Sequence, residues 1–159
     1  MRLARTSPTR KRVLNPECQA RAKQVSPYAA KYGIDTALLC AVIEQESGWQ
    51  WWATRYEPLF YARYIHDIDL PMVEARDRAT SWGYMQIMGE VARELGYTGA
   101  LPDLRIPENG LEFGCKKLSR CLAQCSGDVR CALLKYNGGS RIAYADEVLA
   151  RVSKYTEDK

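Results

Sequence analysis

The sequence predicts a mainly α-helical protein with a single domain. Apolar residues recur at helical spacing over most of the chain, no strong alternating run predicts a strand, and no linker divides the 159 residues. A chain of this length can enclose one hydrophobic core. We expect a basic tail at residues 1–15 and one folded domain at residues 16–159.

The first two expected helices are bounded by capping residues. One covers residues 16–31 and is closed by the glycine at position 33. The other covers residues 36–47, with Asp35 able to cap its first turn and a glycine at position 48 directly after its end.

Residues 49–81 interrupt the helical pattern. They contain two prolines, many charges and seven aromatic side chains between Trp49 and Tyr64. We expect a long, partly helical insertion after the second helix, and a small β-hairpin inside it stays open.

Helical spacing returns in the second half of the chain. Gly96 and the pair Gly138-Gly139 each follow an expected helix, and Asp128 can cap another. The expected ranges are 85–95, 107–123, 128–137 and 143–155.

Composition and charge exclude several classes of protein. Contents of 47% hydrophobic and 26% charged residues are ordinary for a globular domain, and no stretch has the roughly 20 apolar residues of a membrane span. The net charge is +4 with a basic N-terminus, but no zinc-finger or other nucleic-acid motif accompanies it. We therefore expect neither stable membrane insertion nor nucleic-acid binding. The N-terminus also lacks the apolar segment of a secretory signal.

Six cysteines are many for this length. Their spacing does not fit a zinc site, the single histidine adds no cluster, and we expect neither a metal nor a cofactor. Cys121 or Cys125 could reach Cys131 across the turn at Ser126-Gly127, whereas Cys40 and Cys115 occupy apolar helix positions that suit buried thiols.

Glu46 is the candidate catalytic residue. Leu38, Leu39, Val42 and Ile43 define an apolar stripe, and Glu46 continues it at offsets of three and four residues. A carboxylate that faces the core in the last turn of a helix is disfavoured by burial and by the helix dipole, so its pKa should rise, as a general acid requires. From periodicity alone, a glutamate turned out to solvent at a frayed helix end is an equal alternative.

Three short motifs follow one another at helix boundaries. They are Glu46-Ser47, then Ser81 to Met88 (SWGYMQIM), then Lys135 to Gly139 (KYNGG), with Tyr144 beyond. In this order they resemble the soluble lytic transglycosylase and goose-type lysozyme family over roughly residues 25–155. The resemblance implies a lysozyme-like helical domain. Departures from the family pattern are the longer gap between Ser47 and Gly83, and the residues Tyr84, Lys135 and Gly138.

The resemblance also implies roles for individual residues. Glu46 would be the sole catalytic acid and base, and Ser47 would face the scissile bond beside it. Tyr136 would point its hydroxyl group toward Glu46. The residues expected to bind substrate are Ser47, Gly83, Tyr84, Met85, Gln86, Tyr136 and Asn137.

The implied reaction cleaves the β-1,4 bond between N-acetylmuramic acid and N-acetylglucosamine in peptidoglycan glycan strands. Glu46 would protonate the bridging oxygen, and the muramoyl C6 hydroxyl would attack C1 to leave a 1,6-anhydro end. A hydrolytic lysozyme with a second acid is the alternative. Glu57 is the first candidate for that acid, although a salt bridge with a nearby arginine is its expected role, and Asp67, Asp69 and Glu74 are further carboxylates.

Further expectations concern binding and location. One or two aromatic residues of the insertion would line the groove and stack on sugar rings. A non-catalytic wall-binding module is a competing function. The enzyme would act as a monomer on the cell wall, in the periplasm or outside the cell. Small size and the missing export signal resemble a phage endolysin held in the cytoplasm until a holin releases it, or a bacterial enzyme without its signal peptide.

Overall fold

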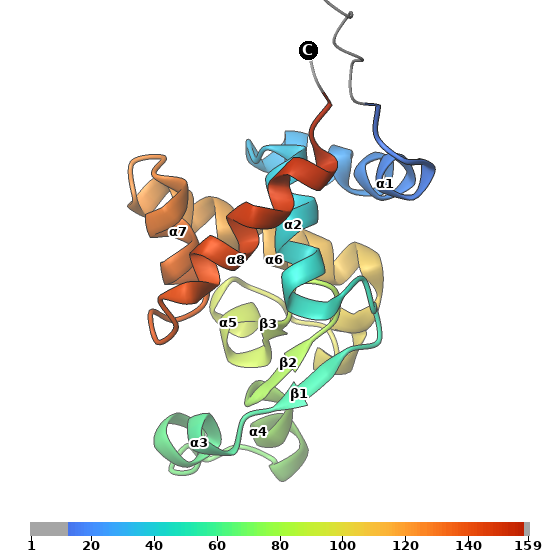
Figure 1. The fold of residues 1–159 in the computed structure, drawn as a ribbon. Coiled ribbons are helices and arrows are strands. Elements are labelled where there is room, and N and C mark those ends of the chain that lie inside the picture. The colour runs from blue at the N-terminus through green and yellow to red at the C-terminus, as the bar shows by residue number, and fades with distance from the viewer. Residues whose placement is uncertain (1–12, 158–159) are drawn as a thin grey trace, which may run out of the picture.

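A computed structural model describes residues 13–157 (Figure 1). All but the last three residues of the expected tail at 1–15 lie outside this range. The α-helices are α1 (Pro16–Tyr32), α2 (Thr36–Ser47), α3 (Pro58–Phe60), α4 (Met72–Arg78), α5 (Gly89–Glu94), α6 (Pro107–Gln124), α7 (Val129–Tyr136) and α8 (Ala143–Val152). A π-helix, η1 (Tyr61–Ile65), and two 3-10 helices, η2 (Leu101–Arg105) and η3 (Ser153–Tyr155), accompany them. The strands are β1 (Thr54–Tyr56), β2 (Thr80–Trp82) and β3 (Ile87–Met88).

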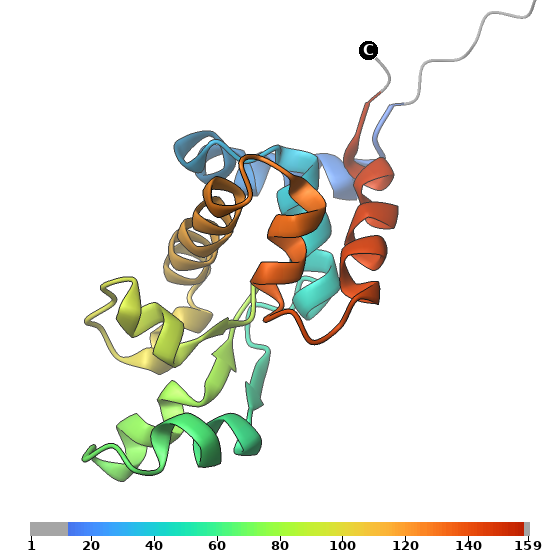
Figure 2. The ribbon, with the colours of Figure 1, turned by 90° about the vertical axis from the view of Figure 1, so that its left-hand side faces the viewer.

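The mainly α fold class predicted from the sequence is confirmed, with one small antiparallel sheet in the order β1-β2-β3. Figures 1 and 2 show two parts: a bundle of α1, α2, α6, α7 and α8, and a smaller part in which the sheet lies beside α3 and α4. Within residues 13–157, no helix is long and apolar enough to cross a membrane.

Local capping explains where the helices of the bundle begin and end. The side chain of Asp35 accepts a hydrogen bond from the backbone N–H of Leu38 at 2.9 Å, and Asp128 does the same for Cys131 at 2.7 Å. Gly48 ends α2 with a φ of 58°, a left-handed conformation that glycine adopts without steric cost.

Helix α2 lies at the centre of the bundle. It packs against α1, α8 and η3, and every residue from Ala37 to Ile43 is buried. The predicted apolar stripe is therefore only part of the buried surface, as expected of a helix that is apolar on all sides. Apart from Thr36 at its first position, only the last turn of α2 carries polar side chains, and Ser47 of this turn contacts the turn between β2 and β3.

The insertion supplies the sheet and its helical cover. β1 pairs with β2, with Thr54 opposite Trp82, and the 23 residues between the strands form α3, η1 and α4 around a small core of Ile65, Ala75 and Ala79. Glu74 of α4 accepts hydrogen bonds from Arg78 and from Arg93 of α5, which ties this cover to the rest of the protein.

The helix predicted at residues 85–95 is wrong in its first four residues. Ile87 and Met88 instead form β3, which pairs with Ser81 and Trp82 of β2, and helix α5 begins only at Gly89. The turn at residues 83–86, which contains two positive φ values, reverses the chain and brings these residues onto the strand before it. The hairpin of β2 and β3 thus begins at the end of the insertion at residues 49–81 and extends beyond it to Met88.

The cysteines divide into one disulfide and buried thiols. Cys125 and Cys131 are bonded across the α6–α7 turn, which selects one of the two pairings left open. Cys40 and Cys115 are free and fully buried, as predicted, and burial raises the pKa of each thiol to about 12. These two thiols are core residues.

Candidate active site

A cleft of about 540 Å³ lies between the bundle and the sheet. Three parts of the chain form it: the last turn of α2, the sheet with residues of α3 and α5, and the wall made by α6, α7, the loop before α8 and the start of α8. The lining residues are Gln45, Glu46, Arg55, Glu57, Phe60, Ser81, Gln86, Met88, Val91, Lys117, Lys135, Tyr136, Asn137, Gly138, Arg141 and Tyr144.

Glu46 lies in the wall of this cleft, half-buried, one residue before the end of α2. Burial raises the pKa of its carboxyl group. A hydrogen bond from the Tyr144 hydroxyl to Oε1, 2.5 Å long, opposes that rise, and so do the positive charges of Lys117, Arg55 and Arg141. A carboxyl group in this setting can hold a proton and still be stabilised after it has lost one.

Tyr136 does not point its hydroxyl at Glu46, and this prediction is wrong. The Tyr136 hydroxyl donates to the backbone oxygen of Met85 at 2.7 Å, and Tyr144 of α8 makes the contact with Glu46 instead. Burial raises the pKa of both tyrosines well above the ordinary value, so both remain hydrogen-bond donors. Tyr136 still lines the cleft, through its ring.

Ser47 connects helix α2 to the turn at residues 83–86 and does not line the cleft. Its hydroxyl lies 2.9 Å from the Tyr84 carbonyl oxygen and 3.2 Å from that of Ile43. The expected position facing the scissile bond is therefore not found. The contact with the Tyr84 oxygen holds α2 against the second motif, whereas the contact with the Ile43 oxygen lies within α2.

Of the residues predicted to bind substrate in the second motif, only Gln86 lines the cleft. Gly83 has a φ of 70°, and a Cβ atom there would lie 2.6 Å from the Leu104 oxygen, so it allows close backbone packing. Tyr84 is buried with its ring edge-on to Trp49, at 5.7 Å between centroids. Met85 is fully buried against Gly114, where an added Cβ would meet its sulfur at 2.4 Å.

Gln86 is held in place by two backbone oxygens. Its Nε2 atom donates to Ala53 at 3.1 Å and to Gly83 at 3.0 Å, and its own φ is 46°, which is unusual for a residue other than glycine. Two hydrogen bonds from the amide nitrogen fix the orientation of the side chain. The Gln86 side chain is therefore held in one orientation where it lines the cleft.

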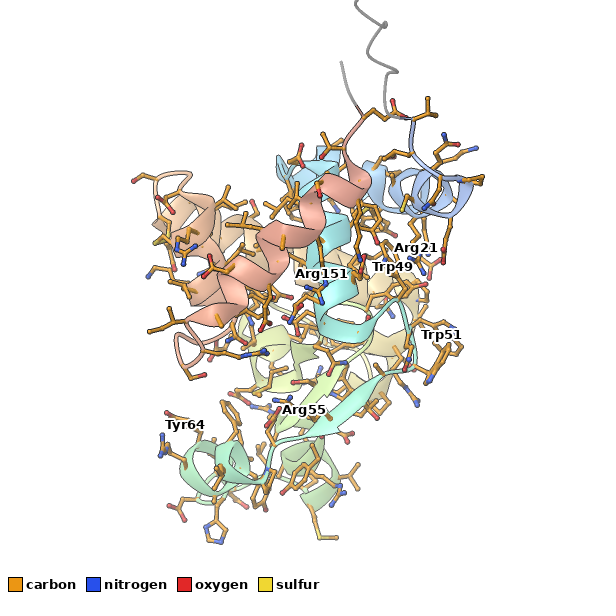
Figure 3. All side chains as sticks on the ribbon, viewed as in Figure 1. Arg21, Trp49, Trp51, Arg55, Tyr64 and Arg151 are labelled. Atoms are coloured by element: carbon orange, nitrogen blue, oxygen red, sulfur yellow. A yellow bond between two sulfur atoms is a disulfide. The ribbon has the colours of Figure 1, made fainter. Side chains whose placement is uncertain are left out.

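Glu57 and Asn137 both line the cleft, as the sequence suggested. Glu57 is bound by Arg55 at 2.5 Å between Oε1 and Nε, so the predicted salt bridge is present. Among the aromatic residues of the insertion, Phe60 alone lines the cleft. Figure 3 shows Trp51 at the outer edge of the molecule, well away from Arg55.

Several cleft residues were not predicted, and Lys117 is the clearest case. Its ammonium group donates to the Tyr136 backbone oxygen at 2.7 Å and lies 4.1 Å from the centroid of that ring. Burial lowers its pKa, and the charge of Glu46 opposes this. The signal was present in the sequence, because Lys117 falls three residues after Gly114 and four before Cys121, both on the buried face of α6.

The family described as Transglycosylase SLT domain matches residues 24–151. The matched span begins within α1 and ends within α8, and it includes every residue that lines the cleft.

Proposed function

The chain belongs to the transglycosylase SLT domain family, and from this premise we propose that Glu46 alone serves as acid and base in cleaving peptidoglycan glycan strands. The family membership makes the protein a peptidoglycan-degrading enzyme of the lytic transglycosylase type. The proposal is that it cleaves the β-1,4 bond between N-acetylmuramic acid and N-acetylglucosamine and leaves a 1,6-anhydromuramoyl end.

In the first step Glu46 donates its proton to the bridging oxygen as the bond between that oxygen and C1 breaks. The observation that carries this assignment is the half-buried position of the carboxyl group in the cleft, because burial raises its pKa and so favours the protonated form that a general acid needs. The hydrogen bond from Tyr144 stabilises the carboxylate that results. The carbonyl oxygen of the substrate's 2-acetamido group bonds to C1 as the bridging oxygen leaves.

In the second step the ionised Glu46 removes the proton from the muramoyl C6 hydroxyl. The C6 oxygen bonds to C1 as the bond between C1 and the acetamido oxygen breaks, Glu46 is protonated again, and no water is consumed. Two carboxyl groups line the cleft, and the second, that of Glu57, is paired with Arg55 at 2.5 Å. A carboxylate engaged by a guanidinium group is a poor nucleophile or base, which favours the reaction that needs only one acid.

Glu57 also supports the alternative, a hydrolytic lysozyme, because it lies in the same cleft as Glu46. Mass spectrometry of the released muropeptides separates the two reactions, since the anhydro product lacks one water. We expect anhydro products and near wild-type rates for Glu57→Gln. Hydrated products that disappear with this substitution would establish the hydrolase.

The central assignment is tested with Glu46→Gln. This variant should no longer clear a peptidoglycan suspension but should still sediment with it, because the amide keeps the shape of the side chain and cannot donate the proton. Glu94→Gln, an exposed position outside the cleft, is the matched control and should clear at the wild-type rate. A Glu46→Gln variant that still clears the suspension would refute catalysis by Glu46.

Location and assembly are also proposals. The enzyme acts as a monomer on the cell wall, in the periplasm or outside the cell. The Cys125–Cys131 disulfide supports the proposed location, because disulfides persist in oxidising compartments. Whether a holin-type release precedes this, as for an endolysin, is tested by expressing the chain alone and measuring lysis with and without membrane permeabilisation.

A further inference from the structure

The wall of the cleft is strongly basic. Four basic side chains line it, those of Arg55, Lys117, Lys135 and Arg141, against the two carboxyl groups of Glu46 and Glu57. When Glu46 is protonated and ready to act as an acid, the excess of positive charge is larger still. A concave surface with charge of one sign concentrates ligands of the opposite sign.

Two of these cations are already engaged inside the protein. Arg55 pairs with Glu57, and Lys117 is bound to the backbone oxygen of Tyr136. Their charges are therefore partly offset or held below the surface of the cleft, and they are not the groups that a ligand would meet first.

The other two cations lie at the outer edge of the wall. Lys135 is exposed, and no hydrogen bond or ion pair to any residue within 13–157 engages its ammonium group. Arg141 pairs with Glu147 at 2.5 Å, yet 56% of its side chain remains exposed. A lysine that lines a cleft with no partner in the described protein is available to an anionic group of the substrate.

The position of these cations relative to Glu46 limits which anion they can meet. Lys135 directly precedes Tyr136, and Arg141 lies three residues before Tyr144, the residue bonded to Glu46. Its charge is one of those that act on the Glu46 carboxyl group. Both side chains line the cleft that holds Glu46, so the anion that they meet belongs to a group that the strand carries within this cleft.

The sugar backbone of peptidoglycan does not itself require cations. Its hydroxyl and acetamido groups are neutral, and the lactyl carboxyl of muramic acid is consumed in the amide bond to the stem peptide. The carboxylates of that peptide are the anions carried next to the bond that is cleaved. Resting on the proposed function, we propose that Lys135 and Arg141 form a subsite for stem-peptide carboxylates, and that the enzyme prefers strands whose peptides carry these charges.

The test compares two substrates that differ only in charge. One is native peptidoglycan, and the other is the same material with its carboxyl groups converted to amides by carbodiimide and ammonia. Wild-type kcat/KM should fall about fivefold on the amidated substrate, the upper range for an exposed ion pair. Lys135→Gln and Arg141→Gln should each lose part of this factor on the native substrate and fall less than the wild type on amidation, and the double variant should lose nothing further on the amidated substrate.

Lys23→Gln is the matched control, because it removes one exposed charge on α1, outside the cleft. It should keep the wild-type preference, whereas an equal loss in this variant would reduce the effect to net charge and overturn the subsite. Lys135→Gln losing equally on both substrates, or on neither, would also overturn it.

Two further arms separate the remaining outcomes. If removal of wall-bound phosphate polymers with hydrofluoric acid abolishes the preference while the peptide carboxyls are intact, the anion is phosphate and the proposal is wrong. Wild-type enzyme that releases no muropeptides from either substrate would refute the proposed function and this inference with it. Active enzyme without any dependence on carboxylates refutes the inference alone.

Discussion

Replacing Tyr144 with phenylalanine removes one hydroxyl group and tests how the acid is tuned. That hydroxyl donates to Glu46 Oε1 at 2.5 Å and favours the ionised carboxylate, so its removal should raise the pKa of Glu46 further. A hydrogen bond to a charged group contributes about 1.5–3 kcal/mol, and about 1.36 kcal/mol corresponds to one pH unit. Because the proposed mechanism requires a protonated Glu46, the basic limb of the pH profile should move to higher pH by about one unit or more.

The assay is the initial rate of muropeptide release at low substrate concentration between about pH 4 and pH 9. Tyr32→Phe is the matched control, since the Tyr32 hydroxyl also donates to a glutamate, Glu112, at 2.5 Å but lies away from the cleft. Its profile should not move. If Tyr144→Phe lowers the rate equally at every pH, the hydroxyl only positions Glu46 and the electrostatic reasoning is wrong.

Three predictions concern the scaffold of the cleft. The hydrogen bond from Arg93 is the chief cause that lowers the pKa of Glu74 to about 2, so the Glu74 carboxylate stabilises the fold above pH 4.5 and this stabilisation is lost as the pH falls toward 2. Glu74→Gln should therefore lower the free energy of unfolding in urea by about 1–2 kcal/mol at pH 7, a figure reduced to allow for the partial exposure of the side chain, and should have no effect near pH 2. Gly83→Ala should destabilise by about 2 kcal/mol or more and reduce activity, because its Cβ would lie 2.6 Å from a backbone oxygen at a φ of 70°; an unchanged melting temperature would contradict this. Reduction of Cys125–Cys131, six residues apart, should cost about 2 kcal/mol, measured by thermal unfolding with and without dithiothreitol.

Local sequence was sufficient to predict most helix ends but not the strands. Asp35, Gly48 and Asp128 act within one turn of the residues that they cap, so their effect can be inferred from neighbours alone. Ile87 and Met88 continue a helical spacing equally well, and their pairing with β2 depends on the turn that precedes them. Short strands of this kind carry too little pattern to be distinguished from a helix.

The candidate site shows the same division between local and distant information. Glu46 could be found because its burial follows from its place on α2. That Tyr144, and not Tyr136, is the partner of Glu46 could not be predicted, because this contact depends on how closely α8 packs against α2. Sequence order alone does not specify which of two nearby tyrosines reaches a given carboxyl group.

The three motifs act mainly by joining the walls of the cleft. The Ser47 hydroxyl binds the Tyr84 oxygen, the Tyr136 hydroxyl binds the Met85 oxygen, and Gln86 binds the oxygen of Ala53 before β1. Each contact links a different element to the turn at residues 83–86. Glu46 directly precedes Ser47, so under the proposed mechanism the loss of any of these links is expected to shift Glu46 relative to the bound glycan strand. Because displacements of about 1 Å reduce catalysis severely, substitutions at these linking residues should lower activity even where they do not touch the substrate.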